Sequence, residues 1–320
     1  MKPTPFPVGD SYNDFSNKHR SVIFFAMLIL ALLGCNNQQT GTEGPQYANE
    51  ALKSEILTYR FAIHPLHNPK KLTESYQPLI DYLNEHVKTV RFQVEASRDY
   101  QAYEAKFRNK EAEFLLPNPW QTLEAMKVGY SVMAMAGDAE DFKGIYIVRK
   151  DGNIHQPRDL KGKAVSYPSP TALAACIMPQ QFLHDNGLNA TRDVINHYVG
   201  SQESSIMNVY LKETAAGATW PPPWRAFQKD HPEEAAQLQV IWETPPLINN
   251  SVMARNDIPS EIRMRVRELL TSLEKTDEGL RILKGMETAR FHAANDDSYD
   301  KVRQFVESFE KNVRLVEEKI

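Results

Sequence analysis

The residues best suited to bind a ligand lie in four loops, each placed where a predicted strand ends and a helix begins. In open α/β sheets, ligands collect at such places because the N–H groups and positive dipole end of the helix attract anions. The first loop, residues 166–173, has the sequence Ser-Tyr-Pro-Ser-Pro-Thr-Ala-Leu. Thr171 either caps the following helix, or binds a ligand oxygen while the N–H groups of Ala172 and Leu173 complete an anion site. Further candidate contacts in this loop are Tyr167 and Ser169.

The second loop, residues 200–205, has the sequence Gly-Ser-Gln-Glu-Ser-Ser. Gln202 can donate to and accept from a ligand without titrating. Glu203 is either a ligand contact or a first-turn carboxylate that the helix dipole favours. Further along the chain, Asn249 and Asn250 either contact the ligand or make turns.

The third and fourth loops combine tryptophan with proline. Asn118 and Trp120 lie in Pro-Asn-Pro-Trp (residues 117–120), and Trp220 and Trp224 flank three prolines. Exposed tryptophans beside rigid proline turns would form a stacking wall, because an indole offers a large apolar face and one N–H donor. The alternative is that Trp220 and Trp224 cover the core.

Other chemistry finds little support in the sequence. His64 and His67 are three residues apart, but no cysteine or carboxylate pair accompanies them, so a zinc site is not expected. The sequence has no nucleophile elbow, no phosphate-binding P-loop and no dinucleotide fingerprint. We therefore predict no enzyme activity, no cofactor and no metal.

The net charge argues against binding to nucleic acid. The chain has a formal net charge of −4, and residues 1–35 contain three basic and two acidic residues, so the remainder carries −5. General nucleic-acid binding needs clustered Lys and Arg to neutralise phosphates.

Strands and helices alternate along the body, which predicts an α/β protein with parallel sheets. At about 100–200 residues per domain, a chain of 320 residues suggests two domains. The natural arrangement is two α/β lobes with a ligand cleft between them. We expect strands over residues 57–63, 90–96, 113–116, 144–148, 164–166, 196–199 and 238–242, and helices over 72–86, 100–109, 120–128, 173–186, 204–212, 261–273 and 299–313.

The N-terminus has the pattern of an export signal. Basic residues 18–20 precede twelve apolar residues, 22–33, which span only about 18 Å as a helix, against a hydrocarbon core of about 30 Å. This is typical of a secretory signal peptide. Its end, Leu-Leu-Gly-Cys, resembles a lipobox, in which Cys35 is lipidated; a signal peptide with a chance cysteine is the alternative. Residues 36–56 are predicted to form a flexible tether, and Cys176 a small buried hydrophobe rather than a reactive thiol.

Five segments in the body recur in order in one family. They are Phe-Ala-Ile-His-Pro (61–65), Tyr-Gln-Pro-Leu (76–79) with Tyr82 and Leu83, Asp-Leu-Lys-Gly-Lys (159–163), Pro-Leu-Ile (246–248) and Phe-His-Ala-Ala (291–294) with Tyr299. On these segments the chain resembles the periplasmic phosphate, phosphite and phosphonate-binding proteins of ABC importers. The resemblance implies the two-lobed type 2 periplasmic-binding fold, with residues 57–145 and 249–320 in one lobe and 146–248 in the other. Two hinge crossings, near residues 141–150 and 243–255, would join the lobes.

The chain departs from this family in the predicted site. Family members carry a Ser-Thr-Ser-Gly cradle, and residues 172–175 here are Ala-Leu-Ala-Ala. A register shifted by three matches residues 169–172 instead, where Pro170 has no N–H to donate. Gln202 replaces a histidine, and residues 214–216 lack the aspartate that receives an organic ammonium group. Aminoalkyl phosphonates should therefore bind poorly, and a ligand with an apolar part against Trp120 or Trp220 should bind better.

The resemblance implies a binding protein anchored by lipid at Cys35 on the periplasmic side of a bacterial membrane or on the outer cell surface. A monomer would capture a small, phosphate- or phosphonate-like anion and deliver it to an ABC permease. The alternative is a lipoprotein of the same fold that signals to a membrane sensor or partner.

Overall fold

The computed structural model describes residues 56–317. The predicted signal peptide, the lipobox with Cys35 and residues 36–55 of the predicted tether lie outside the described residues. Within the described part of the chain, no helix has the length and apolar character needed to span a bilayer.

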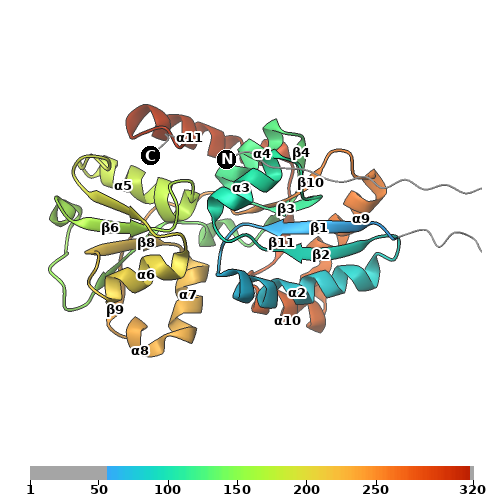
Figure 1. The fold of residues 1–320 in the computed structure, drawn as a ribbon, viewed down its shortest axis with the longest axis horizontal. Helices are drawn as coiled ribbons and strands as arrows, with labels where there is room; N and C mark the ends of the chain where they lie inside the picture. The colour runs from blue at the N-terminus through green and yellow to red at the C-terminus, as the bar shows by residue number, and fades with distance from the viewer. Residues whose placement is uncertain (1–55, 318–320) are drawn as a thin grey trace, which may run out of the picture. The chain divides into compact units, whose positions relative to one another are not determined.

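The described residues form two lobes, each built around its own sheet (Figure 1). The sheet of the first lobe has the order β11-β4-β10-β3-β1-β2. Its strands are β1 (Thr58–Ile63), β2 (Arg91–Glu95), β3 (Phe114–Leu116), β4 (Tyr130–Ala136), β10 (Ser251–Arg255) and β11 (Phe291–Ala293). The first lobe is therefore assembled from both ends of the described chain.

The sheet of the second lobe has the order β7-β6-β8-β5-β9. Its strands are β5 (Ile145–Arg149), β6 (Ala164–Tyr167), β7 (Ile195–Tyr198), β8 (Ala216–Thr219) and β9 (Leu238–Glu243). Ile145, which the sequence analysis assigned to the first lobe, is thus the first residue of a second-lobe strand. The expected two-lobed α/β fold is confirmed.

The expectation of purely parallel sheets is wrong. β1 pairs in parallel with β2 and β3, but β10 lies antiparallel to both β3 and β4. In the second lobe, β5 lies antiparallel to β8 and β9. β11 is also antiparallel to its neighbour β4. Strands β5 and β10 directly follow the two segments that cross between the lobes. Each enters its sheet from the other lobe, and so runs against the neighbouring strands.

Helices cover the sheets largely where hydrophobic periodicity predicted them. The helices of the first lobe are α2 (Pro69–His86), α3 (Tyr100–Arg108), α4 (Pro119–Lys127), α9 (Ser260–Ser272), α10 (Asp277–Gly285) and α11 (Asp300–Asn312). The helices of the second lobe are α5 (Met178–Asp185), α6 (Gln202–Tyr210), α7 (Pro221–Asp230) and α8 (Pro232–Ala235). In α2, for example, Leu72, Tyr76, Leu79 and Leu83 are buried, as expected for an apolar face at helical spacing.

The helix expected over residues 173–186 begins as a π turn, Leu173–Ile177, which continues into α5. Pro179 explains the wider turn. It has no N–H to donate to the carbonyl of Ala175, and its ring would clash with that carbonyl in a regular α-helix.

Two segments cross between the lobes, residues 137–144 and residues 244–250, and they lie side by side. The N–H of Leu247 donates to the Phe142 carbonyl (2.8 Å), and the N–H of Thr244 donates to the Gly144 carbonyl (2.9 Å). The side chain of Asn249 donates to the Asp138 carbonyl (2.9 Å). The crossings therefore form one hydrogen-bonded pair at the junction of the lobes.

Candidate functional site

A small cavity lies between the lobes. Its lining comes from loops and helix ends of both lobes: His64, Tyr100, Asn118, Phe142, residues 172–175, Gln202, Trp220 and Asn250. Its free volume in this conformation, about 10 Å³, holds about one water molecule, so a ligand requires the lobes to move apart.

The second lobe offers the N-terminal end of the π turn to this cavity. The N–H of Ile177 donates to the Ala172 carbonyl (3.1 Å), which is the first hydrogen bond of the turn. Leu173, Ala174 and Ala175 lie before the donor of that bond, so their N–H groups have no acceptor within the turn. All three residues line the cavity. Backbone donors at a helix start can hold an anion without the hydroxyls of a Ser-Thr-Ser-Gly cradle.

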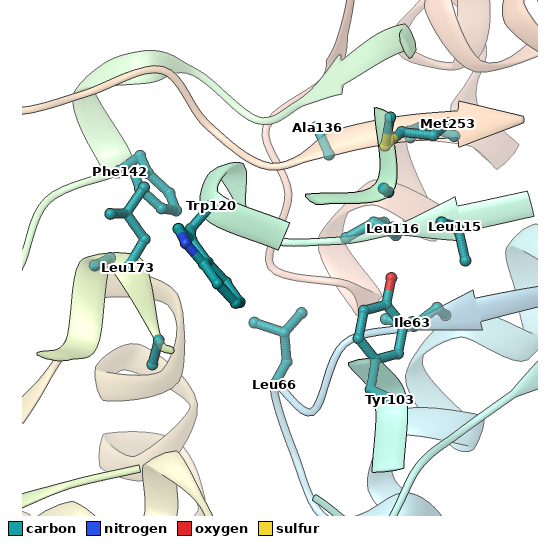
Figure 2. Close-up of a cluster of buried hydrophobic side chains, with 14 of the residues drawn as sticks. Ile63, Leu66, Tyr103, Leu115, Leu116, Trp120, Ala136, Phe142, Leu173 and Met253 are labelled. Atoms are coloured by element: carbon teal, nitrogen blue, oxygen red, sulfur yellow. The ribbon is translucent and has the colours of Figure 1, made fainter. Parts of the chain in front are cut away.

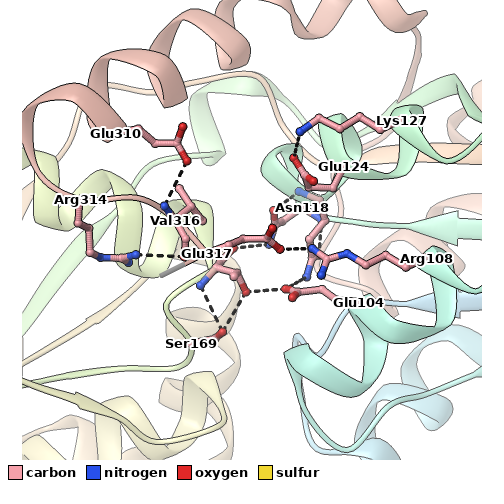
Figure 3. A network of polar contacts seen from close by, with 12 residues as sticks. Glu104, Arg108, Asn118, Glu124, Lys127, Ser169, Glu310, Arg314, Val316 and Glu317 are labelled. Carbon is pink, nitrogen blue, oxygen red and sulfur yellow. Dashed lines mark hydrogen bonds and ion pairs between the residues drawn. The ribbon is translucent and has the colours of Figure 1, made fainter. Parts of the chain in front are cut away.

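Thr171 is occupied by a contact across the lobes (Figure 3). Its hydroxyl donates to Glu104 Oε1 (2.6 Å) and lies 3.0 Å from Ser169 Oγ. The Asn118 side chain donates to the Thr171 carbonyl (3.1 Å). One of the two roles predicted for Thr171, capping of the following helix, is therefore wrong. The residue at the cap position is Ala172, which makes no side-chain hydrogen bond.

Glu104 is buried in α3 and was not among the contacts predicted from the sequence. It also accepts a hydrogen bond from Gln121 Nε2 (3.0 Å). Burial raises the pKa of this carboxyl, while the hydrogen bonds from Thr171 and Gln121 act against the rise. Glu104 thus joins α3, α4 and the 168–172 loop.

Gln202 bridges the lobes at the cavity wall. It is the first residue of α6, after the cap residue Ser201, and its side chain is buried. Its Nε2 donates to the Tyr100 hydroxyl of the first lobe (3.0 Å), and its Oε1 accepts from the Thr219 hydroxyl (2.8 Å). Glu203 lies outside the cavity lining, where its carboxylate pairs with His231 Nε2 (3.2 Å).

The tryptophans are not exposed. Trp120 is only 2% exposed and lies near Leu66, Phe142 and Leu173 rather than in the cavity lining (Figure 2). Trp220 is also buried, but it does line the cavity, and its ring centroid lies 5.4 Å from that of Phe142.

The prolines after Trp220 begin a helix, so the expected rigid turn is wrong. Pro221 is the first residue of α7, and proline is tolerated in a first helical turn because the N–H groups there have no helical partner. Trp224 belongs to this helix and packs against Phe227 in the core of the second lobe.

The remaining predicted contacts are structural in this conformation. Asn249 binds Asp138 through its amide nitrogen and the Asn250 N–H through its amide oxygen (2.8 Å). Tyr167 is fully buried in β6, and Ser169 lies beside Thr171. None of these three residues lines this cavity, but Asn249 lines a second pocket, which it shares with Trp220 and Asn250.

Three lining residues were not among the candidate contacts: His64, Tyr100 and Phe142. His64 follows β1 directly and Tyr100 begins the helix after β2, so the strand-end rule that identified the other loops could have found both. For Asn250 the sequence allowed two roles, a ligand contact or a turn residue. The buried amide oxygen of Asn250 has no hydrogen-bond partner among the described residues.

The described residues that line the cavity carry no charge. Burial lowers the pKa of His64 to about 4, so its imidazole is neutral, and its Nδ1–H donates to the Leu116 carbonyl (2.9 Å). The described residues contain no cluster of three or more His, Cys, Asp or Glu side chains suited to a metal. An anion in this cavity would be held by N–H dipoles and neutral polar groups, without a paired cation.

Cys176 is the one free cysteine within the described residues, and it is buried, as predicted. Burial raises the pKa of its thiol to about 11, although nearby Arg314 lowers it. At neutral pH the side chain is therefore a protonated thiol and a poor nucleophile.

A family model described as "ABC transporter, phosphonate, periplasmic substrate-binding protein" matches residues 61–299. The chain is 22% identical over 191 residues to the probable ABC transporter phosphite binding protein PhnD1 of Prochlorococcus marinus (strain MIT 9301). The match covers 54% of this chain and 63% of that relative, so the chain spans less than two thirds of the relative's length.

Two solved structures share the fold. A binding protein component of an ABC phosphonate transporter from Pseudomonas aeruginosa superimposes with a TM-score of 0.75 at 17% identity, covering 81% of this chain and 88% of that one. PhnD1 from Prochlorococcus marinus in complex with methylphosphonate gives a TM-score of 0.71 at 19% identity, covering 79% and 98%.

Proposed function

Because the chain belongs to the family of periplasmic phosphonate substrate-binding proteins of ABC transporters, we propose that it captures a small phosphonate- or phosphite-like anion for import. Members of this family are binding components and not enzymes. The partner that receives the ligand would be an ABC permease. The observation that carries the proposal is the uncharged cavity between the lobes, with the helix start at residues 172–175 on one wall.

The lining favours a ligand with a small, uncharged substituent. Methylphosphonate would place its oxygens toward the N–H groups of residues 173–175 and its methyl group toward Trp220 and Phe142. An aminoalkyl phosphonate would bring an ammonium group into a cavity that has no carboxylate among its described lining residues. Burying an unpaired charge is costly, so such ligands should bind weakly.

Calorimetric titration with methylphosphonate, phosphite, phosphate and aminoethylphosphonate tests this proposal. We expect methylphosphonate or phosphite to bind at least about tenfold more tightly than aminoethylphosphonate, which corresponds to about 1.4 kcal/mol. Submicromolar affinity for aminoethylphosphonate would refute the ligand class. Heat signals from none of the four ligands would refute the function.

A matched pair of variants locates the site. Gln202→Leu removes the amide from the cavity wall and should abolish or strongly weaken methylphosphonate binding. Gln181→Leu changes the same residue type on α5, where the side chain binds only Asp185 (2.7 Å), and should leave affinity unchanged. Equal affinities of both variants would place the ligand elsewhere.

We also propose that the protein is anchored by lipid at Cys35, on the strength of the apolar run and the Leu-Leu-Gly-Cys sequence. Metabolic labelling with a fatty-acid analogue should mark the wild-type protein and not Cys35→Ala. Equal labelling of both proteins would exclude this anchor.

Transport and signalling can be separated in cells. If the protein serves an importer, a strain without it should lose uptake of methylphosphonate supplied at low concentration. Normal uptake, together with an altered transcriptional response to methylphosphonate, would instead support the signalling alternative.

A further inference from the structure

The loop that precedes the π turn has few hydrogen bonds of its own. Residues 168–172 include Pro168 and Pro170, which have no N–H group. The N–H of Ala172 donates to the Ser169 carbonyl at 3.2 Å, and the Pro168 carbonyl accepts from the Gly200 N–H (2.9 Å). The shape of this loop must therefore be maintained by contacts from other elements.

Arg314 supplies such contacts on both sides of the π turn. Its Nη2 donates to the Pro170 carbonyl (2.8 Å), before the turn, and its Nε donates to Gln180 Oε1 (2.8 Å), after the turn. The same Nη2 lies 3.6 Å from Cys176 Sγ, within the turn. One rigid guanidinium thus spans the whole segment that presents residues 172–175 to the cavity.

Arg314 is itself held firmly. Only 8% of its surface is exposed, its Nη1 donates to the carbonyls of Leu315 (2.9 Å) and Val316 (3.2 Å), and its guanidinium carbon lies 5.4 Å from the centre of the Phe309 ring. Because these neighbours fix the side chain, its hydrogen bonds to the loop lose little additional conformational entropy.

The segment that carries Arg314 contacts both lobes. It follows α11, which packs on α4, and Glu317 forms an ion pair with Arg108 of α3. On the other side of the loop, Glu104 and Asn118 of the first lobe bind Thr171. The loop of the second lobe is therefore held on one side by the C-terminal segment and on the other by Glu104 and Asn118 of the first lobe, which Figure 3 shows.

We propose that Arg314 is a positioning residue for ligand binding, which holds the 168–172 loop and the π turn in the shape that presents residues 172–175 to the cavity. Arg314 does not line the cavity and acts through these residues. The role in ligand binding rests on the proposed function, whereas the role in holding the loop does not.

Hydrogen exchange in the ligand-free full chain tests the structural part. In Arg314→Ala, the hydrogen-bonded amides of Ala172 and Ile177, at the start and the end of the π turn, should exchange about tenfold faster than in wild type, as expected for the loss of charge-assisted hydrogen bonds. Amides of β1 should exchange at the wild-type rate. Arg303→Ala is the matched control, because Arg303 lies on α11, is 48% exposed and only approaches Asp300 at 3.9 Å.

Calorimetry with methylphosphonate tests the binding part. The dissociation constant of Arg314→Ala should rise about tenfold or more, and that of Arg303→Ala should not change. Arg314→Lys keeps the charge but lacks the planar fork, so it should behave like Arg314→Ala. It also serves as the test variant if Arg314→Ala does not fold.

The outcomes separate the two claims. Unchanged exchange of the Ala172 and Ile177 amides in the Arg314 variants overturns the proposal, and so does faster exchange with unchanged affinity. Full affinity in Arg314→Lys would show that the charge matters rather than the geometry, which also overturns it. If the wild-type protein binds neither methylphosphonate nor phosphite, the proposed function fails, while exchange still decides whether Arg314 holds the loop.

Discussion

At the scale of single residues, the polar groups of the cavity already have partners. Gln202 uses both ends of its amide, with Tyr100 at one end and Thr219 at the other. A ligand that binds Gln202 must therefore exchange these hydrogen bonds for its own. Such an exchange favours ligands whose geometry reproduces the lost bonds, since unpaired buried polar groups are costly.

Tyr100 and Tyr103 form a matched pair for testing the contact across the lobes. Both are buried on α3, but the Tyr100 hydroxyl binds Gln202, whereas the Tyr103 hydroxyl has no partner among the described residues. Tyr100→Phe should lower the free energy of unfolding by about 1–2 kcal/mol, while Tyr103→Phe should be neutral or stabilising. Chemical denaturation of the two variants measures this difference, and equal losses would contradict the assigned contact.

Because His64 is buried, we expect the free energy of unfolding to decrease in acid. Burial lowers its pKa from 6.5 to about 4 in the folded protein, so between these values the unfolded chain binds more protons and stability falls as pH falls. The full loss is on the order of 3 kcal/mol. In His64→Asn, the amide can still donate to Leu116 but does not titrate.

Denaturation of wild type and His64→Asn from pH 7 to pH 4 is the measurement. The variant should lose less stability than the wild type over this range. It should still lose some, because the pKa of His67 is also lowered to about 4 and His67 remains in the variant. Parallel curves for the two proteins would mean that His64 does not stay neutral in the fold.

At the scale of elements, the π turn and the first crossing are packed against each other. A Cβ atom on Gly144 would lie 2.5 Å from the Ala174 carbonyl oxygen and 2.8 Å from Pro179 Cδ. Neither neighbour is a flexible side chain, so glycine is required where the crossing passes the turn.

Gly144→Ala should therefore displace the turn, with a loss of about 1–3 kcal/mol in the free energy of unfolding and weaker ligand binding. Gly285→Ala is the control, since a Cβ at the end of α10 meets nothing within 4 Å. It should be neutral or slightly stabilising. Thermal unfolding and calorimetry of both variants measure these effects, and an unaffected Gly144→Ala protein would show that the turn can move freely.

At the scale of the whole molecule, the described residues show the lobes joined by two adjacent crossings and by hydrogen bonds around a small cavity. A ligand can enter this cavity only if the lobes separate, which breaks contacts such as Thr171 with Glu104 and Gln202 with Tyr100. Ligand binding would then shift the population toward the closed form.

Small-angle scattering provides the measurement of this shift. We expect a smaller radius of gyration with saturating methylphosphonate than without ligand. Thr171→Val, which removes a closing hydrogen bond, should enlarge the difference by opening the ligand-free form. Identical profiles with and without bound ligand would argue against a receptor that closes.

The sequence by itself determined the alternation of strands and helices, because the period of apolar residues shows which face each element buries. It also placed Ala172, Leu173 and Gln202 after strands, and these residues line the cavity. It did not predict the strands β4, β8, β10 and β11. The Ala-Gly-Ala-Thr sequence of β8, for example, has little intrinsic strand preference and becomes a strand by pairing with β5 and β6. The helical start at Pro221 was also missed, because the proline run resembled a turn.

Only the tertiary structure decided which residues meet across the lobes. Thr171 and Glu104 are 67 residues apart, and no local pattern marks them as partners. The burial of Trp120 and the direction of β10 likewise depend on how the chain returns to the first lobe. Local periodicity reports which face is apolar, whereas the identity of the neighbour on that face follows from the packing of distant segments.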